Sequence, residues 1–113
     1  MVGPLYLKMV NGTRTILKDL PRFFPEFADR TEFEFAGFGW FLGWNDGCGD
    51  ASAQEYEFNM VNMIKDVRKE FDSPQMAVSI PVSGFDGWEQ TSPRRLEIIQ
   101  AQFNSANVFL TWA

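Results

Sequence analysis

The chain has 113 residues, an apolar share of 45% and a formal net charge of −5. This length and composition predict one globular domain over residues 1–113 and exclude a disordered protein. The sequence contains no histidine. It therefore excludes, within one chain, a Ser-His-Asp triad, a Cys-His pair and a histidine-ligated metal. We expect no metal and no cofactor.

The net charge, the cysteine count and the N-terminal sequence limit which partners and which cellular compartment we expect. Fifteen acidic residues stand against ten basic ones, and the resulting field would repel a phosphate backbone, so we expect no nucleic-acid partner. The single cysteine, Cys48, cannot form an intrachain disulfide. Residues 1–10 lack the pattern of a signal peptide, and no stretch approaches the ~20 apolar residues of a membrane span. These features predict a soluble, cytoplasmic protein without a membrane partner.

An apolar pattern at helical spacing predicts a first helix over residues 4–20. Asn11 and Gly12 lie in its middle, where glycine costs about 1 kcal/mol relative to alanine, so we expect the helix to start late or to break there. Residues 21–31 carry two prolines and three phenylalanines without either period, which predicts a loop. The apolar positions of the helix are Leu5, Met9, Ile16, Leu17 and Leu20.

Two strands and a helix are predicted in the middle of the chain. Residues 33–42 begin with alternation and become a continuous apolar run, which is typical of a strand covered on both faces. Ser52 and Glu55 form a capping box for a helix over residues 52–71, and residues 76–82 predict a second short strand. The buried face of this helix is expected to comprise Tyr56, Met60, Met63, Ile64, Val67 and Phe71.

A third helix is predicted with Ser92 as its cap and Pro93 at its first position. The tail, residues 107–113, is read as a short last strand. The order strand, helix, strand, helix is typical of a parallel sheet with right-handed crossovers, so the predicted fold class is α/β. The buried stripe of the third helix is expected to comprise Leu96, Ile99, Phe103 and Ala106.

The candidate ligand loops begin near Gly43 and Ser83, because open parallel sheets bind ligands beyond the carboxyl ends of their strands. The backbone N–H of a flexible glycine and the side-chain amide of Asn45 make a donor pair suited to an oxyanion. Turn statistics explain the same residues without any function. The candidate ligand-loop residues are Trp44, Ser83, Gly84 and Trp88.

Each candidate also has a simpler interpretation. Ser83 follows a strand as a nucleophile would, yet no histidine exists to activate it, so a turn residue is the alternative. Trp44 and Trp88 could offer flat faces to a sugar ring, or they could pack against the core. Asp46 and Asp50 could serve as an acid and a base, although nothing in their spacing requires it.

Four blocks of sequence occur in a familiar order: FEFAGFGWFLGWNDG, YEFNMVNMIKDVRKEF, MAVSIPVSGFDGW and RRLEIIQAQF. Over roughly residues 33–107 the chain resembles the sialate O-acetylesterase-like carbohydrate esterases, a branch of the SGNH hydrolases. The resemblance implies a flavodoxin-like α/β/α hydrolase that removes acetyl groups from sugars. The nucleophile motif (GQSN or GDS) and the DxxH motif of such enzymes are not in this sequence, so we expect a small, truncated version of their parallel sheet with flanking helices.

The resemblance also assigns an oxyanion-hole remnant. Gly43, Asn45 and Asp46 match the GxND pattern of SGNH enzymes, whose Gly and Asn are oxyanion donors. Relatives in this branch usually show a phrase like WHQGWND. Here Phe41 and Leu42 stand where those relatives have two polar residues, and neither can form a side-chain hydrogen bond.

These features lead to a functional hypothesis without catalytic residues. The chain is expected to be a non-catalytic esterase-like domain that acts, if at all, by binding or self-association, with an acetylated sugar as the candidate ligand. The alternative is a carbohydrate O-acetylesterase whose missing parts come from another chain. Loss of a neighbouring strand would leave an apolar sheet edge. We therefore expect a homodimer, formed by edge pairing, exchange of a terminal segment or packing of the exposed aromatic face.

Overall fold

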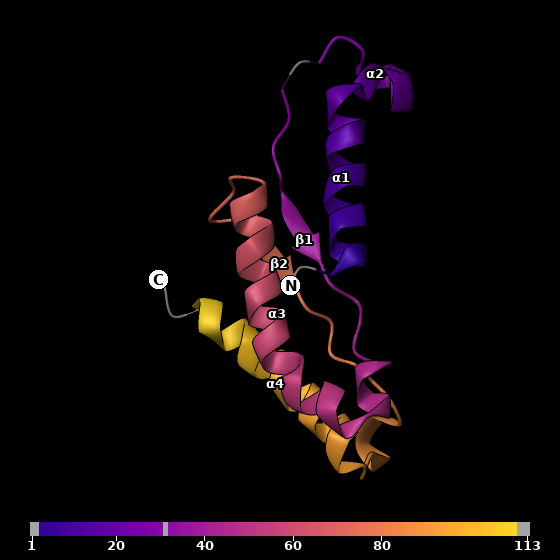
Figure 1. The fold of residues 1–113 in the computed structure, drawn as a ribbon, viewed down its shortest axis with the longest axis vertical. Coiled ribbons are helices and arrows are strands. Elements are labelled where there is room, and N and C mark those ends of the chain that lie inside the picture. Colours follow the sequence, from indigo (N-terminus) through magenta and orange to yellow (C-terminus); the bar gives the residue numbers. More distant parts are fainter. Residues whose placement is uncertain (1–2, 31, 111–113) are drawn as a thin grey trace. The chain divides into compact units, whose positions relative to one another are not determined.

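The computed structural model describes residues 3–30 and 32–110, and for residues 109 and 110 only the backbone. The chain forms two compact units, Met1–Glu34 and Phe35–Ala113, called unit 1 and unit 2 below. Each unit is described by itself. Figure 1 shows the elements of both, with unit 1 in indigo and purple.

Unit 1 is helical. It contains α1 (Pro4–Lys18), the single turn α2 (Leu20–Phe23) and a 3-10 turn at Pro25–Phe27. The predicted late start or break near Gly12 is wrong, because α1 runs continuously through it. One glycine destabilises a helix by only about 1 kcal/mol, and the other residues of α1 stabilise the helix enough to offset this. The predicted loop is also partly helical, since a proline occupies the first turn of each short helix, where its missing N–H is not needed.

A two-stranded parallel sheet lies in unit 2. The strand β1 (Gly37–Gly39) pairs with β2 (Ala77–Ser79) in the register Gly37 to Ala77, and Trp40 extends the ladder by donating its N–H to Ser79 O at 2.9 Å. The predicted parallel pairing and the α/β class are confirmed. The prediction of a long first strand covered on both faces is wrong, because β1 has three residues, of which Gly37 and Gly39 are exposed and Phe38 is half-buried.

The long helix α3 (Asp50–Glu70) connects the two strands. Its buried residues are Ala53, Tyr56, Met60, Ile64 and Val67. Four of these confirm the predicted face, whereas the predicted Met63 and Phe71 are half-buried. The predicted capping box is wrong: the helix begins two residues earlier, its N-cap is Gly49, and no side chain caps it. The helix ends at Glu70 with Phe71 as its C-cap. Asp72, with a φ of 48°, then turns the chain, and Ser73 donates its N–H to Arg68 O at 2.8 Å.

The last helix, α4 (Pro93–Leu110), begins where the sequence predicts but turns a different face inward. Leu96 and Phe103 from the predicted buried stripe are 45% and 53% exposed. The residues that α4 buries instead are Ile98, Ala101, Gln102 and Ser105. The predicted last strand is wrong as far as residue 110, which is helical; residues 111–113 lie outside the described part.

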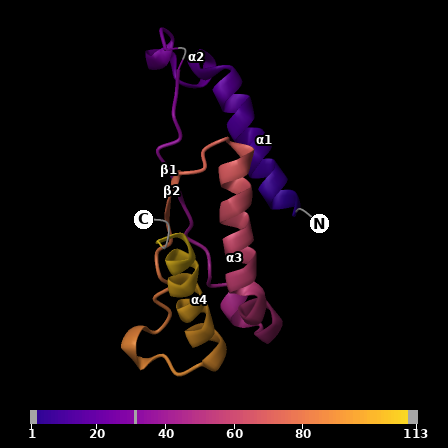
Figure 2. The ribbon, with the colours of Figure 1, turned by 90° about the vertical axis from the view of Figure 1, so that its left-hand side faces the viewer.

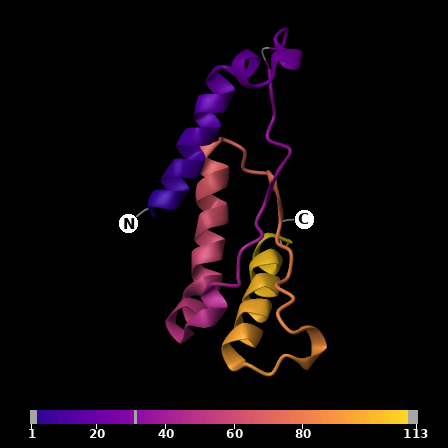
Figure 3. The same ribbon diagram turned by 90° about the vertical axis from the view of Figure 1, so that its right-hand side faces the viewer.

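The core of unit 2 forms where α3 and α4 pack side by side (Figures 2 and 3). Half-buried side chains from the strands and the following loops complete it. Among the residues that the structure describes, no helix has both the length and the apolar character of a transmembrane span. The core comprises Ala53, Tyr56, Met60 and Ile64 of α3 and Ile98 and Ala101 of α4, packed by Trp40, Met63, Val78, Ile80 and Phe85.

Candidate functional site

A buried polar cluster lies where the chain leaves the carboxyl ends of β1 and β2. We call it the Gln102 cluster: Gln102 of α4, Tyr56 of α3, Ser83 after β2 and Trp40 after β1. The Gln102 amide nitrogen donates to the Tyr56 hydroxyl at 3.2 Å and to Ser83 Oγ at 3.0 Å. The Gln102 amide oxygen accepts the Ser83 backbone N–H at 2.8 Å. Both protons and the oxygen of one side-chain amide are therefore used.

The Tyr56 hydroxyl is the second centre of the Gln102 cluster. It donates to Leu42 O at 2.6 Å and accepts the indole N–H of Trp40 at 3.3 Å. Tyr56 and Gln102 are 4% and 2% exposed. Because buried polar groups cost free energy unless they are paired, this cluster fixes the segments after both strands to α3 and α4.

Gly43 is a glycine for reasons of space. A β-carbon at this position would lie 2.5 Å from Ser83 Oγ and 2.8 Å from the Gln102 amide nitrogen. No side chain fits there unless the cluster moves. The residue that the sequence assigns to an oxyanion hole therefore has a structural role, which is to let the backbone approach the Gln102 cluster closely.

A pocket of about 290 Å³ opens between the segment after β1 and α3. We call it the Asp46 pocket. Its walls are mainly apolar, and the polar residues Asp46 and Asn59 are part of the lining. Most binding pockets combine these features, an apolar lining with a few polar groups that orient the ligand. The pocket is lined by Trp40, Leu42, Asp46, Tyr56, Asn59, Met60 and Met63.

Asp46 has a perturbed carboxyl group. Burial raises the pKa of the Asp46 carboxyl above its ordinary value of 3.8, and the hydrogen bond to its own backbone N–H partly offsets this effect. Burial disfavours the charged form of a carboxyl group. Perturbed groups that line a pocket are candidates for ligand contacts.

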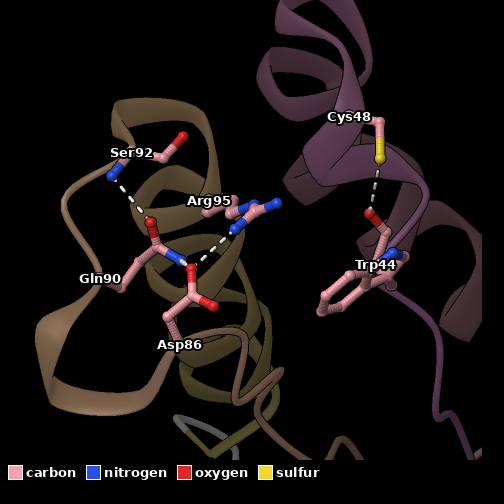
Figure 4. Close-up of polar contacts among 6 residues, drawn as sticks. All are labelled: Trp44, Cys48, Asp86, Gln90, Ser92 and Arg95. Carbon is pink, nitrogen blue, oxygen red and sulfur yellow. Dashed lines mark hydrogen bonds and ion pairs between the residues drawn. The ribbon is translucent and has the colours of Figure 1, made fainter.

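The loops that follow β1 and β2 are also joined by an aromatic clamp, formed by Trp44, Phe85, Arg95 and Asp86. Figure 4 shows Trp44, Arg95 and Asp86 of this clamp. The rings of Trp44 and Phe85 have centroids 5.4 Å apart, and the Arg95 guanidinium carbon lies 5.4 Å from the first ring and 5.5 Å from the second. Arg95 also donates to the Asp86 carboxylate at 2.8 Å. Asp86 further accepts from Gln90 at 3.0 Å.

The aromatic clamp stabilises an unfavourable backbone conformation at Phe85. Phe85 has a φ of 42°, in the left-handed region that bulky residues rarely adopt. A β-carbon on the buried Gly47 would lie 3.1 Å from the Phe85 ring. The first loop thus leaves room for this ring, and the packing compensates for its unfavourable backbone conformation.

The structure brings together only some of the predicted site residues. Gly43 and Ser83 meet in the Gln102 cluster, Asp46 lines the pocket and Trp44 belongs to the aromatic clamp. The other three predicted residues are exposed and do not line the pocket: Asn45, Gly84 and Trp88. Cys48 is exposed too, and its thiol lies 3.5 Å from Trp44 O (Figure 4).

Sequence reasoning missed three residues of this region. Gln102 and Arg95 lie on α4, where the apolar period pointed to other positions as the buried face. Asn59 lies on α3 beside the predicted core stripe and has no distinguishing sequence signal. Tyr56 was predicted as core, and its hydroxyl was the only available sign of a polar role.

The described residues contain no group of three or more cysteines, aspartates and glutamates placed to hold a metal ion. No protein family, curated protein or solved structure significantly matches this chain. The site must therefore be interpreted from its own chemistry.

Proposed function

We propose that unit 2 is a non-catalytic, esterase-like domain that binds an acetylated sugar in the Asp46 pocket. The order β1, α3, β2, α4 is consistent with a truncated flavodoxin-like sheet, and the sequence blocks quoted above support an esterase-like origin. The observation that carries the proposal is the pocket itself, a mainly apolar pocket whose lining includes Asp46, Asn59 and Trp40.

The lining of the pocket suits the two halves of such a ligand. A carboxyl and an amide can hydrogen-bond to sugar hydroxyls or to an ester carbonyl. The ring of Trp40 and the side chains of Met60 and Met63 offer apolar contacts to a sugar face and to an acetyl methyl group. A volume of about 290 Å³ lies just below the usual range for ligand pockets, which favours a monosaccharide over a longer chain.

The surroundings of Ser83 support the absence of catalysis. An attacking serine needs a proton acceptor beside its hydroxyl. The group that contacts Ser83 Oγ is the amide nitrogen of Gln102, which is a donor and cannot remove a proton. The same glutamine also accepts the Ser83 backbone N–H, so it serves to anchor the loop.

Ligand titration tests the binding. We expect 6-O-acetylglucose to change the tryptophan fluorescence of the full chain in a saturable way, and glucose to bind at least about tenfold more weakly because it lacks the acetyl group. Asn59→Leu should abolish the response. Trp88→Ala, at an exposed position outside the pocket, should keep it. No response at millimolar ligand would reject the proposal.

Hydrolysis of p-nitrophenyl acetate tests the catalytic alternative. We expect the folded chain to hydrolyse this ester no faster than a heat-denatured sample. A faster rate that Asp46→Ala abolishes would overturn the non-catalytic interpretation and support an acetylesterase.

A further inference from the structure

The outward face of α4 is an apolar stripe that unit 2 does not bury. Leu96 and Phe103 are 45% and 53% exposed, and Ile99 and Ala106 are half-buried. These four residues, called the α4 stripe, follow each other at spacings of three, four and three. This is the spacing of the contact positions in a two-helix coiled coil. The helix thus has two packing faces, and the Gln102 cluster occupies the other one.

The charge distribution along α4 is unusual for an exposed helix. Residues 98–110 contain no charged side chain. The exposed side of α3, in contrast, carries Glu55, Lys65, Asp66 and Lys69. Solvent-facing helix surfaces normally carry charges opposite the core, so the uncharged stretch indicates a surface that is covered when the protein functions.

We propose that the α4 stripe is the interface of a homodimer in which two copies of α4 pack antiparallel. The chain carries a net charge of −5, so two copies repel each other over most of their surface. The uncharged stretch is where they can meet without this cost. The amides beside the stripe are already paired within unit 2, because Gln100 donates to Asn104 Oδ1 and Asn104 donates to the Glu57 carboxylate, each at 2.9 Å, so the apolar side chains of the stripe must supply the contact.

The order of side chains in the stripe makes it self-complementary. In an antiparallel pair centred on residue 101, Leu96 lies opposite Ala106 of the second copy and Ile99 lies opposite Phe103. In the contact between Leu96 and Ala106, a large side chain meets a small one, as interdigitated packing requires. A twofold axis repeats each layer, as in other isologous dimers.

Sedimentation velocity of the full chain tests the interface. At micromolar concentration we expect about twice the monomer mass of 13.0 kDa. Phe103→Glu and Leu96→Glu, in different contacts of the stripe, should each raise the dimer dissociation constant at least about 30-fold, because each places a charge in an apolar contact. Unchanged circular dichroism would show that both variants fold. A monomeric wild-type chain, or a dimer that withstands both changes, would overturn the proposal.

A matched control and a cross-linking experiment test the geometry. Phe58, on the outward side of α3, is 72% exposed, and Phe58→Glu should leave the dimer intact. In a Cys48→Ser background, the variants Ile99→Cys and Phe103→Cys should form a disulfide when mixed and much less when oxidised alone. Efficient cross-linking of each variant to itself would indicate parallel helices and would contradict the antiparallel pair.

Discussion

The amide nitrogen of Gln102 and the hydroxyl oxygen of Tyr56 lie 3.2 Å apart inside unit 2, although 46 residues separate them in the sequence. Through their other hydrogen bonds, these two side chains reach the backbone of both loops, at Leu42 and Ser83. A single polar contact between α3 and α4 therefore connects the segments that follow the two strands.

Gln102→Ala should destabilise unit 2 strongly. The change leaves the Ser83 N–H without its acceptor and removes a donor from Tyr56, and each unpaired buried group costs about 1–3 kcal/mol. We expect urea unfolding to show a loss of at least about 2 kcal/mol. Gln100→Ala, at an exposed position on the same helix, is the control and should change stability by less than about 0.5 kcal/mol. Equal losses for the two variants would contradict a special role for Gln102.

Gly43→Ala should strain the Gln102 cluster by direct overlap. The new methyl group would lie 2.5 Å from Ser83 Oγ, and overpacking of this kind costs about 1–3 kcal/mol. Ser83→Ala removes the overlapping oxygen, so the double variant should lose less stability than the sum of the two single changes. Gly84→Ala is the control, because a β-carbon there meets nothing within 4 Å. Additive losses in the Gly43/Ser83 cycle would show that the overlap is relieved elsewhere.

Asp46→Asn should stabilise the protein at neutral pH. Because burial raises the pKa of Asp46 in the folded state, its ionisation opposes folding. The stability that the protonated carboxyl provides is complete below pH 3.8, the ordinary pKa, and is lost as the pH rises through the raised value. Thermal melts should therefore show a higher Tm for the variant at pH 7 and a shrinking difference towards pH 3.5. A Tm gain of the same size from Glu89→Gln, an exposed carboxyl, would argue against burial as the cause.

The second loop should loosen when the aromatic clamp is weakened. Arg95→Lys keeps a positive charge near Asp86 but removes the planar group that lies over Trp44 and Phe85. Exposed ion pairs and cation–π contacts contribute about 1 kcal/mol or less, so global unfolding should shift little. Hydrogen exchange at the amides of Gly87 and Gln90, which close the loop by backbone hydrogen bonds, should become several-fold faster. Unchanged exchange would assign the ordering of this loop to the Gln102 cluster alone.

The sequence predicts the helix α3 and the parallel pairing well, because apolar periodicity and the strand order are local signals. It fails at α4 for a physical reason. The strongest apolar period of that helix marks Leu96 and Phe103, whereas burial in unit 2 falls on Gln102 and Ser105. A polar side chain becomes a core residue only when its partners are in place, and those partners come from distant parts of the chain.

The candidate site shows the same limit. Gly43 and Asp46 stand out in the sequence as loop residues after a strand, and both belong to the region described above. Asn59 lines the pocket from a helix, where nothing in its neighbours distinguishes it. Tertiary packing, which no local pattern encodes, decides which residues of α3 face the pocket.

The pairing of Gly37 with Ala77 has a consequence for the order of folding. The whole of α3 lies between the two strands, so this short ladder must close a long loop for few hydrogen bonds. Helical turns form locally and much faster than such distant pairings. We therefore expect the turns of α3 to form before the strand ladder. Because so few hydrogen bonds hold it, the ladder should open more readily than the helices of unit 2, which makes the strand residues early sites for native-state proteolysis.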